Sequence, residues 1–186
     1  MPLNERKANI SVPEGELARQ REYAEAVRSI IEAKYSEPPK AFVHTYGCQG
    51  NVADGERLKG MLADMGYELV EELEGADLVL YNTCAIREHA EDRVFGNVGA
   101  LKGIKNANRD MRILLCGCMM QQEHVADKIR NSYPFVDIVF GTHVIHRLPE
   151  LLYNNLSTGK RIYELPESDG VIAEELPVPR DSSFKA

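Results

Sequence analysis

Residues 76–83 have the sequence ADLVLYNT and are followed directly by Cys84. This segment is apolar enough to predict a strand buried on both faces, as in parallel sheets that helices cover on either side. The next segment, AIREHAEDRVFGNVGALKGIKNAN at 85–108, repeats its apolar residues at helical spacing. A buried strand that leads into a helix is the repeating unit of α/β proteins, so this stretch sets the fold class.

The same alternation extends outward in both directions. Before the central strand, the pattern predicts a strand at 41–47, a helix at 51–66 and a short strand at 67–70. After it come two further strands and two helices, at 111–117, 121–133, 135–141 and 146–154. The expected fold is therefore α/β: an open, mostly parallel, doubly wound (Rossmann-like) sheet of about five strands, with helices on both faces and right-handed crossovers.

The pattern divides the chain into three regions. Residues 1–39 are an N-terminal helical lead-in, with one amphipathic helix predicted between Glu16 and Tyr35. Residues 40–156 form the α/β domain. Residues 157–186 are expected to add one extended piece and then to become an acidic, proline-containing linker. Because this region ends without a terminating element, we expect the chain to be the front part of a longer protein.

Composition excludes several classes of function. The 22 Lys and Arg residues against 29 Asp and Glu give a net charge of −7, which argues against tight nucleic-acid binding by phosphate neutralisation alone. No segment reaches the roughly 18 apolar residues of a membrane span. The polar N-terminus has no apolar signal-peptide core. These features predict a cytoplasmic protein, in which the four cysteines stay reduced and are candidates for metal binding or reactivity.

Three of the cysteines occupy equivalent positions. Cys48, Cys84 and Cys118 each lie one or two residues beyond a predicted strand and shortly before a helix, 34 to 36 residues apart. The carboxyl ends of parallel strands lie along one edge of the sheet, where ligands bind near the reversal of strand order. The three thiols are therefore expected to converge there. Cys116 lies within a strand, whereas Cys118 lies past its end, so Cys116 is expected to stay in the core.

Converging thiols suit an iron–sulfur cluster. A helix N-terminus lowers the pKa of a cysteine, and thiolates are the usual ligands of such clusters. Three ligands to a four-iron cluster would leave one iron open. The alternatives are that the cysteines simply pack at strand ends, that they hold zinc, or that the domain binds a nucleotide or flavin. The absence of recurring histidine partners disfavours zinc, and no strand ends in GxGxxG or GxxxxGK[ST].

Several polar residues lie close to these cysteines in the sequence. The candidates for contact with a cluster are Gln49, Asn51, Asn82, Thr83 and Arg87. Asn82 or Thr83 could instead cap the following helix. Arg87 is unfavourable in the first turn of a helix and needs a negative partner, which could be a cluster, a phosphate, or a neighbouring carboxylate, Glu88 or Glu91.

Four longer motifs carry a family resemblance: TYGCQGN-x-x-D, NTCAIREHAEDRV, LCGCMMQQE and FGTHVIHRLPELL. Together they resemble the N-terminal domain of the methylthiotransferases from about Ala41 to Leu152. The IREHAEDRV segment is similar to the branch of tRNA-2-methylthio-isopentenyladenosine synthases, the MiaB family.

The resemblance implies an α/β domain that holds an auxiliary [4Fe-4S] cluster on three cysteines, which match Cys48, Cys84 and Cys118, with one open iron. The whole enzyme of that family adds a methylthio group to carbon 2 of isopentenyl-adenosine next to the tRNA anticodon. It uses two S-adenosylmethionine molecules, and a second [4Fe-4S] cluster in a radical SAM domain cleaves one of them to a radical.

The sequence also departs from the family pattern. The second cluster needs a CxxxCxxC motif, which is absent here. We likewise expect the chain to lack the radical SAM domain and the tRNA-binding domain, to be inactive alone and to bind tRNA weakly or not at all. Gly50 and Gly55 replace the family's Met and Ser or Thr, and are expected to loosen the loop after Cys48.

Overall fold

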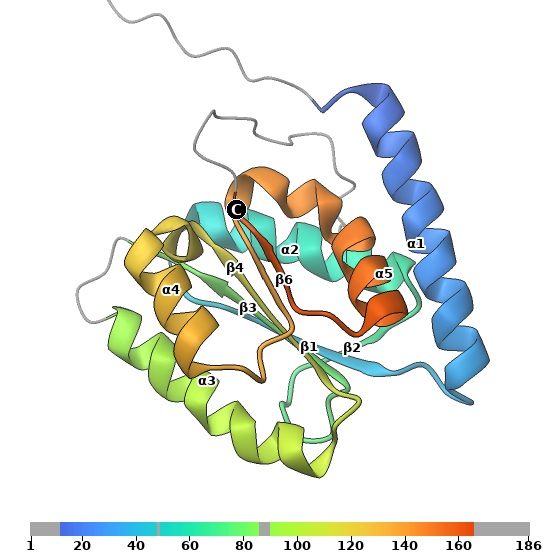
Figure 1. The fold of residues 1–186 in the computed structure, drawn as a ribbon. Coiled ribbons are helices and arrows are strands. Elements are labelled where there is room, and N and C mark those ends of the chain that lie inside the picture. The colour runs from blue at the N-terminus through green and yellow to red at the C-terminus, as the bar shows by residue number, and fades with distance from the viewer. Residues whose placement is uncertain (1–11, 48, 86–89, 166–186) are drawn as a thin grey trace, which may run out of the picture.

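The computed structural model describes residues 12–47, 49–85 and 90–165. Within them the chain forms one parallel sheet of six strands in the order β2-β1-β3-β4-β5-β6 (Figure 1). The strands are β1 (Lys40–Thr45), β2 (Glu68–Val70), β3 (Leu78–Thr83), β4 (Arg112–Gly117), β5 (Ile138–Phe140) and β6 (Ile162–Glu164). The predicted α/β fold with a mostly parallel sheet is confirmed. The sheet gains β6, which lies in the region for which an extended piece was expected.

Helices cover both faces of this sheet (Figure 1). The helices α2 (Gln49–Asp64) and α5 (Leu148–Thr158) pack on one face, and α1 (Glu14–Lys34) packs against α5. The helices α3 (Ala90–Ala107) and α4 (Glu123–Ser132) cover the other face. Short 3-10 turns, η1 (Cys118–Gln121) and η2 (Thr142–Arg147), follow β4 and β5. Among the described residues, no helix combines the length and the apolar character needed to cross a membrane.

The two central strands separate two apolar cores. Every residue of β3 is buried, which matches the continuous apolar pattern of residues 76–83. Alternate side chains of β3 and β4 enter the two cores because successive residues of a strand point to opposite faces. On the α2 side lie Leu78, Leu80 and Leu114, and on the α3 side lie Val79, Ile113 and Leu115.

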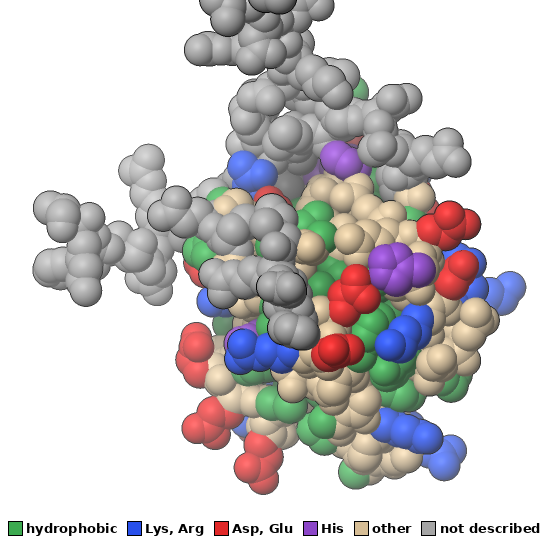
Figure 2. Space-filling view, turned by 90° about the vertical axis from the view of Figure 1, so that its left-hand side faces the viewer, with side chains coloured by type: hydrophobic (Ala, Val, Ile, Leu, Met, Phe, Trp, Pro, Cys, Tyr) green, Lys and Arg blue, Asp and Glu red, His purple; other side chains and the backbone are tan. Residues whose placement is uncertain are grey.

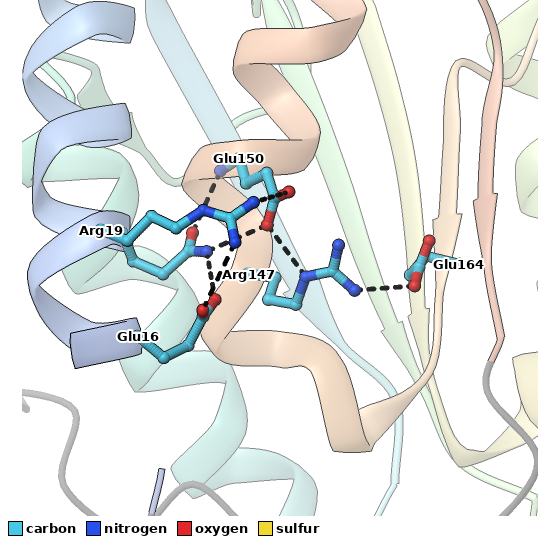
Figure 3. A network of polar contacts seen from close by, with 6 residues as sticks. Glu16, Arg19, Arg147, Glu150 and Glu164 are labelled. Carbon is cyan, nitrogen blue, oxygen red and sulfur yellow. Dashed lines mark hydrogen bonds and ion pairs between the residues drawn. The ribbon is translucent and has the colours of Figure 1, made fainter. Parts of the chain in front are cut away.

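A buried carboxylate ties the N-terminal helix to the domain (Figure 3). Glu150 in α5 is only 6% exposed, and it accepts hydrogen bonds from Arg19 at 3.0 Å and Gln20 at 3.1 Å, both in α1. Arg147 donates to Glu150 at 2.9 Å and to Glu164 of β6 at 2.7 Å. The network therefore joins α1, α5 and the last strand.

Arg161, just before β6, holds the end of α4. Its guanidinium donates to the backbone carbonyls of Val136 at 2.9 Å, Tyr133 at 3.1 Å and Arg130 at 3.2 Å. The last carbonyls of a helix have no partners within the helix, and a positive charge is favourable at this end. Arg161 therefore supplies hydrogen-bond donors to the carbonyl groups at the end of α4 and attaches β6 to this helix.

Replacing Arg161 with alanine is expected to lower the free energy of unfolding by about 1–3 kcal/mol, because three carbonyls, two of them in partly buried contacts, lose their donor. Arg109→Ala, at an exposed position, should change it by less than about 0.5 kcal/mol. Urea unfolding followed by circular dichroism measures both. Equal effects of the two substitutions would contradict this role for Arg161.

Candidate functional site

The predicted ligand edge lies at the point where the strand order reverses. Strand β1 pairs with β2 on one side and with β3 on the other. The helix that follows β1 lies on one face of the sheet, and the helix that follows β3 lies on the other. The connections after β1 and β3 therefore lead apart at the carboxyl ends of these strands, which is the position where open α/β sheets bind ligands. Cys48 follows β1, but it lies outside the described residues.

Cys84 and Cys118 are neighbours at this edge. Cys84 is 2% exposed, and Cys118, which opens η1, is half-buried. The backbone N–H of Ala85 donates to the Cys118 sulfur at 3.2 Å. Burial raises the pKa of Cys118, the Ala85 N–H lowers it, and the nearby Cys84 thiol raises it again. The structure thus brings together two of the three predicted ligands from separate strand–helix units.

The turn after β1 approaches the same place. Gly47 has φ +126°, and a Cβ there would lie 2.3 Å from the Cys84 Cβ and 3.0 Å from its sulfur. Only a residue without a side chain fits such a contact at positive φ. The residue that precedes Cys48 in the sequence therefore packs directly on Cys84.

The turn after β4 packs equally closely on the turn after β3. Gly117 has φ +109°, and a Cβ there would lie 2.1 Å from the Thr83 carbonyl oxygen and 2.6 Å from its nitrogen. The chain leaves β4 through this glycine and places Cys118 in a 3-10 turn. The helix predicted at 121–133 is observed as α4, Glu123–Ser132, and the extended residue Gln122 separates it from η1.

Cys116 is buried in the core, as expected. It has no exposed surface, and its sulfur lies 3.7 Å from the Asn82 Oδ1 in the neighbouring strand. Burial raises the pKa of this thiol well above its ordinary value, and the charges of Asp54 and Cys118 add to the effect. A neutral thiol within the sheet differs from the two cysteines that lie beyond the strand ends.

Three of the polar candidates form one buried network. The Asn82 Nδ2 donates to the backbone carbonyl of Asn51 at 2.7 Å, and the Thr83 hydroxyl donates to the carbonyl of Cys116 at 2.7 Å. The Asn51 Nδ2 donates to the carbonyl of Thr83 at 2.9 Å. These contacts connect α2, β3 and β4, whereas α3 is described only from Ala90 onward. Asn82 thus binds α2 and Thr83 binds β4, while the start of the helix that they were suggested to cap lies outside the described residues.

The remaining candidates cannot be placed. Arg87 and Glu88 lie outside the described residues, as does the Gln49 side chain. Glu91, one suggested partner of Arg87, lies within hydrogen-bond distance of the His124 Nε2, at 3.1 Å.

One expectation about this region is wrong. Gly50 and Gly55 lie within α2, so they do not loosen a loop. Gly55 is buried, and a Cβ there would lie 2.4 Å from the Thr45 hydroxyl. The glycine lets α2 approach β1 closely. A glycine inside a predicted helix could have indicated this contact, because it often has a packing reason.

The donor set suits a sulfur-ligated cluster. Cys84 and Cys118 supply soft sulfur ligands, which select iron–sulfur clusters and zinc over magnesium or calcium. The described residues contain no group of three His, Cys, Asp or Glu side chains that could hold a metal ion, and Cys48 is not among them. The two neighbouring thiols and the glycine turns around them fit a site whose third ligand follows Gly47.

The surface beside this edge is mixed in charge. On the side that carries α3 and α4, Figure 2 shows acidic and basic side chains interspersed rather than gathered into one basic patch. Such a surface gives little of the phosphate attraction on which nucleic-acid binding depends.

Comparison with known proteins identifies the family of this domain. The family described as "Uncharacterized protein family UPF0004" matches residues 40–141, more than half of the chain. Several curated relatives carry the name tRNA-2-methylthio-N(6)-dimethylallyladenosine synthase. The one from Thermoanaerobacter sp. (strain X514) is 44% identical over 178 residues, which cover 96% of this chain and 37% of that protein.

Two other relatives with the same name match this chain over a similar region. The protein from Clostridium tetani is 49% identical over 145 residues, covering 78% of this chain and 32% of its own length. The protein from Acetivibrio thermocellus is 40% identical over 183 residues, covering 97% of this chain and 38% of its own length. The chain spans about a third of the length of these relatives. The chain belongs to the UPF0004 family, the N-terminal domain of the MiaB-type methylthiotransferases.

Proposed function

We propose that this chain binds a [4Fe-4S] cluster through Cys48, Cys84 and Cys118 and is the auxiliary cluster domain of a tRNA methylthiotransferase. One observation carries the proposal: the Cys84 and Cys118 thiols are neighbours at the switch point of the sheet, beside the turn that leads to Cys48. The alternatives of separate packing at strand ends and of a nucleotide or flavin site do not account for this convergence.

The chain's own residues have defined parts in such a site. The backbone N–H of Ala85 donates to the Cys118 sulfur at 3.2 Å and would stabilise it as a thiolate ligand. Gly47 and Gly117 allow the three turns to approach one another. Burial of Cys84 keeps water from its sulfur. When bound through three sulfurs, the cluster would supply one open iron able to take a sulfur atom or another ligand.

The wider activity is part of the same proposal. The relatives' name describes an enzyme that makes a 2-methylthio derivative of dimethylallyl-adenosine in tRNA. We propose that this domain serves that reaction in the cytoplasm together with a radical SAM domain. That domain would bind S-adenosylmethionine and a second [4Fe-4S] cluster. Recognition of tRNA would rest mainly on other domains, because the net charge here is −7.

Anaerobic reconstitution with iron and sulfide tests the cluster assignment. The parent chain should acquire the broad visible absorption of an iron–sulfur cluster, with about four iron and four sulfide per chain for the [4Fe-4S] type. Cys48→Ala, Cys84→Ala and Cys118→Ala should each lose the cluster. Cys116→Ala is the matched control and should retain it, because Cys116 lies within the buried strand.

Other outcomes would contradict the proposal. A parent chain that takes up zinc but no iron would favour a zinc site, and a yellow chain with flavin fluorescence would favour a flavin module. If Cys116→Ala lost the cluster while Cys118→Ala kept it, the ligand set would be wrong.

A further inference from the structure

The three turns at the ligand edge meet at a single peptide group. The Thr83 carbonyl oxygen accepts a hydrogen bond from the Asn51 Nδ2 at 2.9 Å and lies 3.7 Å from the Cys118 sulfur. Gly117 packs against the same carbonyl, since a Cβ there would lie 2.1 Å from it. Thr83 precedes Cys84 in the sequence, so a shift of this peptide would carry Cys84 with it.

Two side-chain amides fix this junction from the α2 side. The Asn82 Nδ2 donates to the Asn51 carbonyl at 2.7 Å, and the Asn51 Nδ2 also lies 3.4 Å from the Asn82 Oδ1. Asn51 is 5% exposed and Asn82 is fully buried. Buried amides that bond reciprocally hold one geometry strongly, because any displacement leaves polar atoms unpaired.

The pair connects elements that the backbone alone does not hold in register. Asn51 lies in the first turn of α2, and Asn82 lies near the end of β3. Helix α2 packs on the sheet mainly through apolar contacts, which are nondirectional. The amide contacts add the direction that sets where α2 begins relative to the Thr83–Ala85 segment.

We propose that Asn51 and Asn82 are positioning residues of the cluster site. Their paired amides hold the Thr83 peptide, and through it keep the sulfurs of Cys84 and Cys118 in the spacing that one cluster needs. The inference rests on the proposed function and assigns Asn51 and Asn82 a specific action in it. Partners that orient metal ligands in this way affect metal affinity by about 10- to 100-fold.

The chemistry requires a donor at position 51. Aspartate would place an oxygen against the Thr83 carbonyl and the Asn82 Oδ1, both of which are acceptors. Leucine has nearly the same shape and no charge, but it would remove the amide donor from both acceptors and leave them only weak thiol contacts at 3.7 Å. Both substitutions should therefore displace the Thr83 peptide, and the leucine variant does so without adding charge near the cluster.

Asn155 provides a matched control. It is 1% exposed, and its Nδ2 donates to the Lys160 carbonyl at 2.9 Å, the same kind of contact at the same distance as that of Asn51 with Thr83. It lies near the end of α5 and bonds to the turn before the start of β6, at the opposite edge of the sheet. Substitution there removes a hydrogen bond of the same length, in a partly buried contact, without affecting the thiols.

The experiment compares Asn51→Asp and Asn51→Leu with Asn155→Asp and Asn155→Leu in the reconstituted chain. Thermal unfolding measures the stability of each variant. Retention of iron against a chelator measures the affinity of the site for iron. The electron paramagnetic resonance spectrum of the reduced cluster reports the geometry around the iron. Both pairs should lose similar stability. Only the Asn51 variants should lose about 10- to 100-fold in iron affinity and change the spectrum.

A second measurement needs no cluster. Hydrogen exchange of the Ala85 amide, which donates to the Cys118 sulfur, should become faster in the Asn51 variants than in the parent and remain unchanged in the Asn155 variants. If the Asn51 variants are too unstable to reconstitute, the milder Asn51→Ser is measured in the same way.

The outcomes separate this inference from the proposed function. If the parent binds a cluster and the Asn51 variants match the Asn155 variants in iron affinity, spectrum and Ala85 exchange, the positioning role is wrong and the cluster assignment stands. If the parent binds no cluster, the proposed function fails, and the positioning role fails with it.

Discussion

Replacing Gly117 with alanine is expected to lower the free energy of unfolding by about 3–5 kcal/mol. The new Cβ would lie 2.1 Å from the Thr83 carbonyl oxygen, and φ at this position is +109°, which L-residues rarely adopt. The clash involves backbone in a central strand pair, where neither strand can move without breaking its ladder. The effect should be visible as a large decrease in the urea midpoint.

Gly159→Ala is the matched control for the backbone conformation. Gly159 has φ +67°, but a Cβ there would meet nothing within 4 Å. This substitution carries only the cost of the left-handed conformation, about 1–2 kcal/mol. Equal losses for the two variants would show that the contact between β4 and Thr83 is looser than described.

Replacing Glu150 with alanine should lower the free energy of unfolding by about 3 kcal/mol. The carboxylate is 6% exposed and accepts hydrogen bonds from Arg19, Gln20 and Arg147. Removing it takes one acceptor from Gln20, itself 4% exposed, and one from Arg147, which keep only Glu16 and Glu164 respectively. Because this network joins α1 to α5, the loss should also increase hydrogen exchange along α1.

The same carboxylate makes stability depend on pH. Burial raises the pKa of Glu150, but the hydrogen bonds from Arg147 and Gln20 and the nearby positive charges outweigh it, so the pKa is lower than usual. A lowered pKa in the folded state stabilises the protein above the ordinary pKa of about 4.3, and this stabilisation is lost as pH falls through the folded value.

Glu150→Gln should therefore have a flatter stability profile than the parent between about pH 5 and pH 3. The exposed Glu22 gives the control, and Glu22→Gln should leave the profile unchanged. Urea unfolding at a series of pH values measures both. A parent and a Glu150→Gln variant with parallel profiles would show that the ion network does not stabilise the fold.

Much of the fold could be predicted from the chain because its signals are local. The apolar run at 76–83 predicted a strand buried on both faces, and every residue of β3 is buried. Alternation of strands and helices predicted a parallel sheet. The strand-end positions of Cys84 and Cys118 predicted their convergence, since parallel strands share one carboxyl edge. That Cys48 joins them remains a prediction.

The structure differs from the expectations of the sequence where contacts between distant segments determine the local conformation. The helical pattern of residues 121–133 corresponds to α4, but the 3-10 turn η1 before it, which follows the glycine turn after β4, had no signal in the sequence. The local sequence around Gly55 does not indicate whether a strand packs against this position. Only the packed structure shows that Thr45 occupies the space a side chain would need.

The sequence by itself determined the order of the elements, the apolar faces they bury and the strand ends at which the cysteines lie, because these depend on residue type and on spacing along the chain. Only the tertiary structure decided the pairing of Asn51 with Asn82 and their hold on the Thr83 peptide. A hydrogen bond between residues 31 positions apart depends on the register of helix against sheet. That register is set by packing of the whole domain rather than by any local pattern.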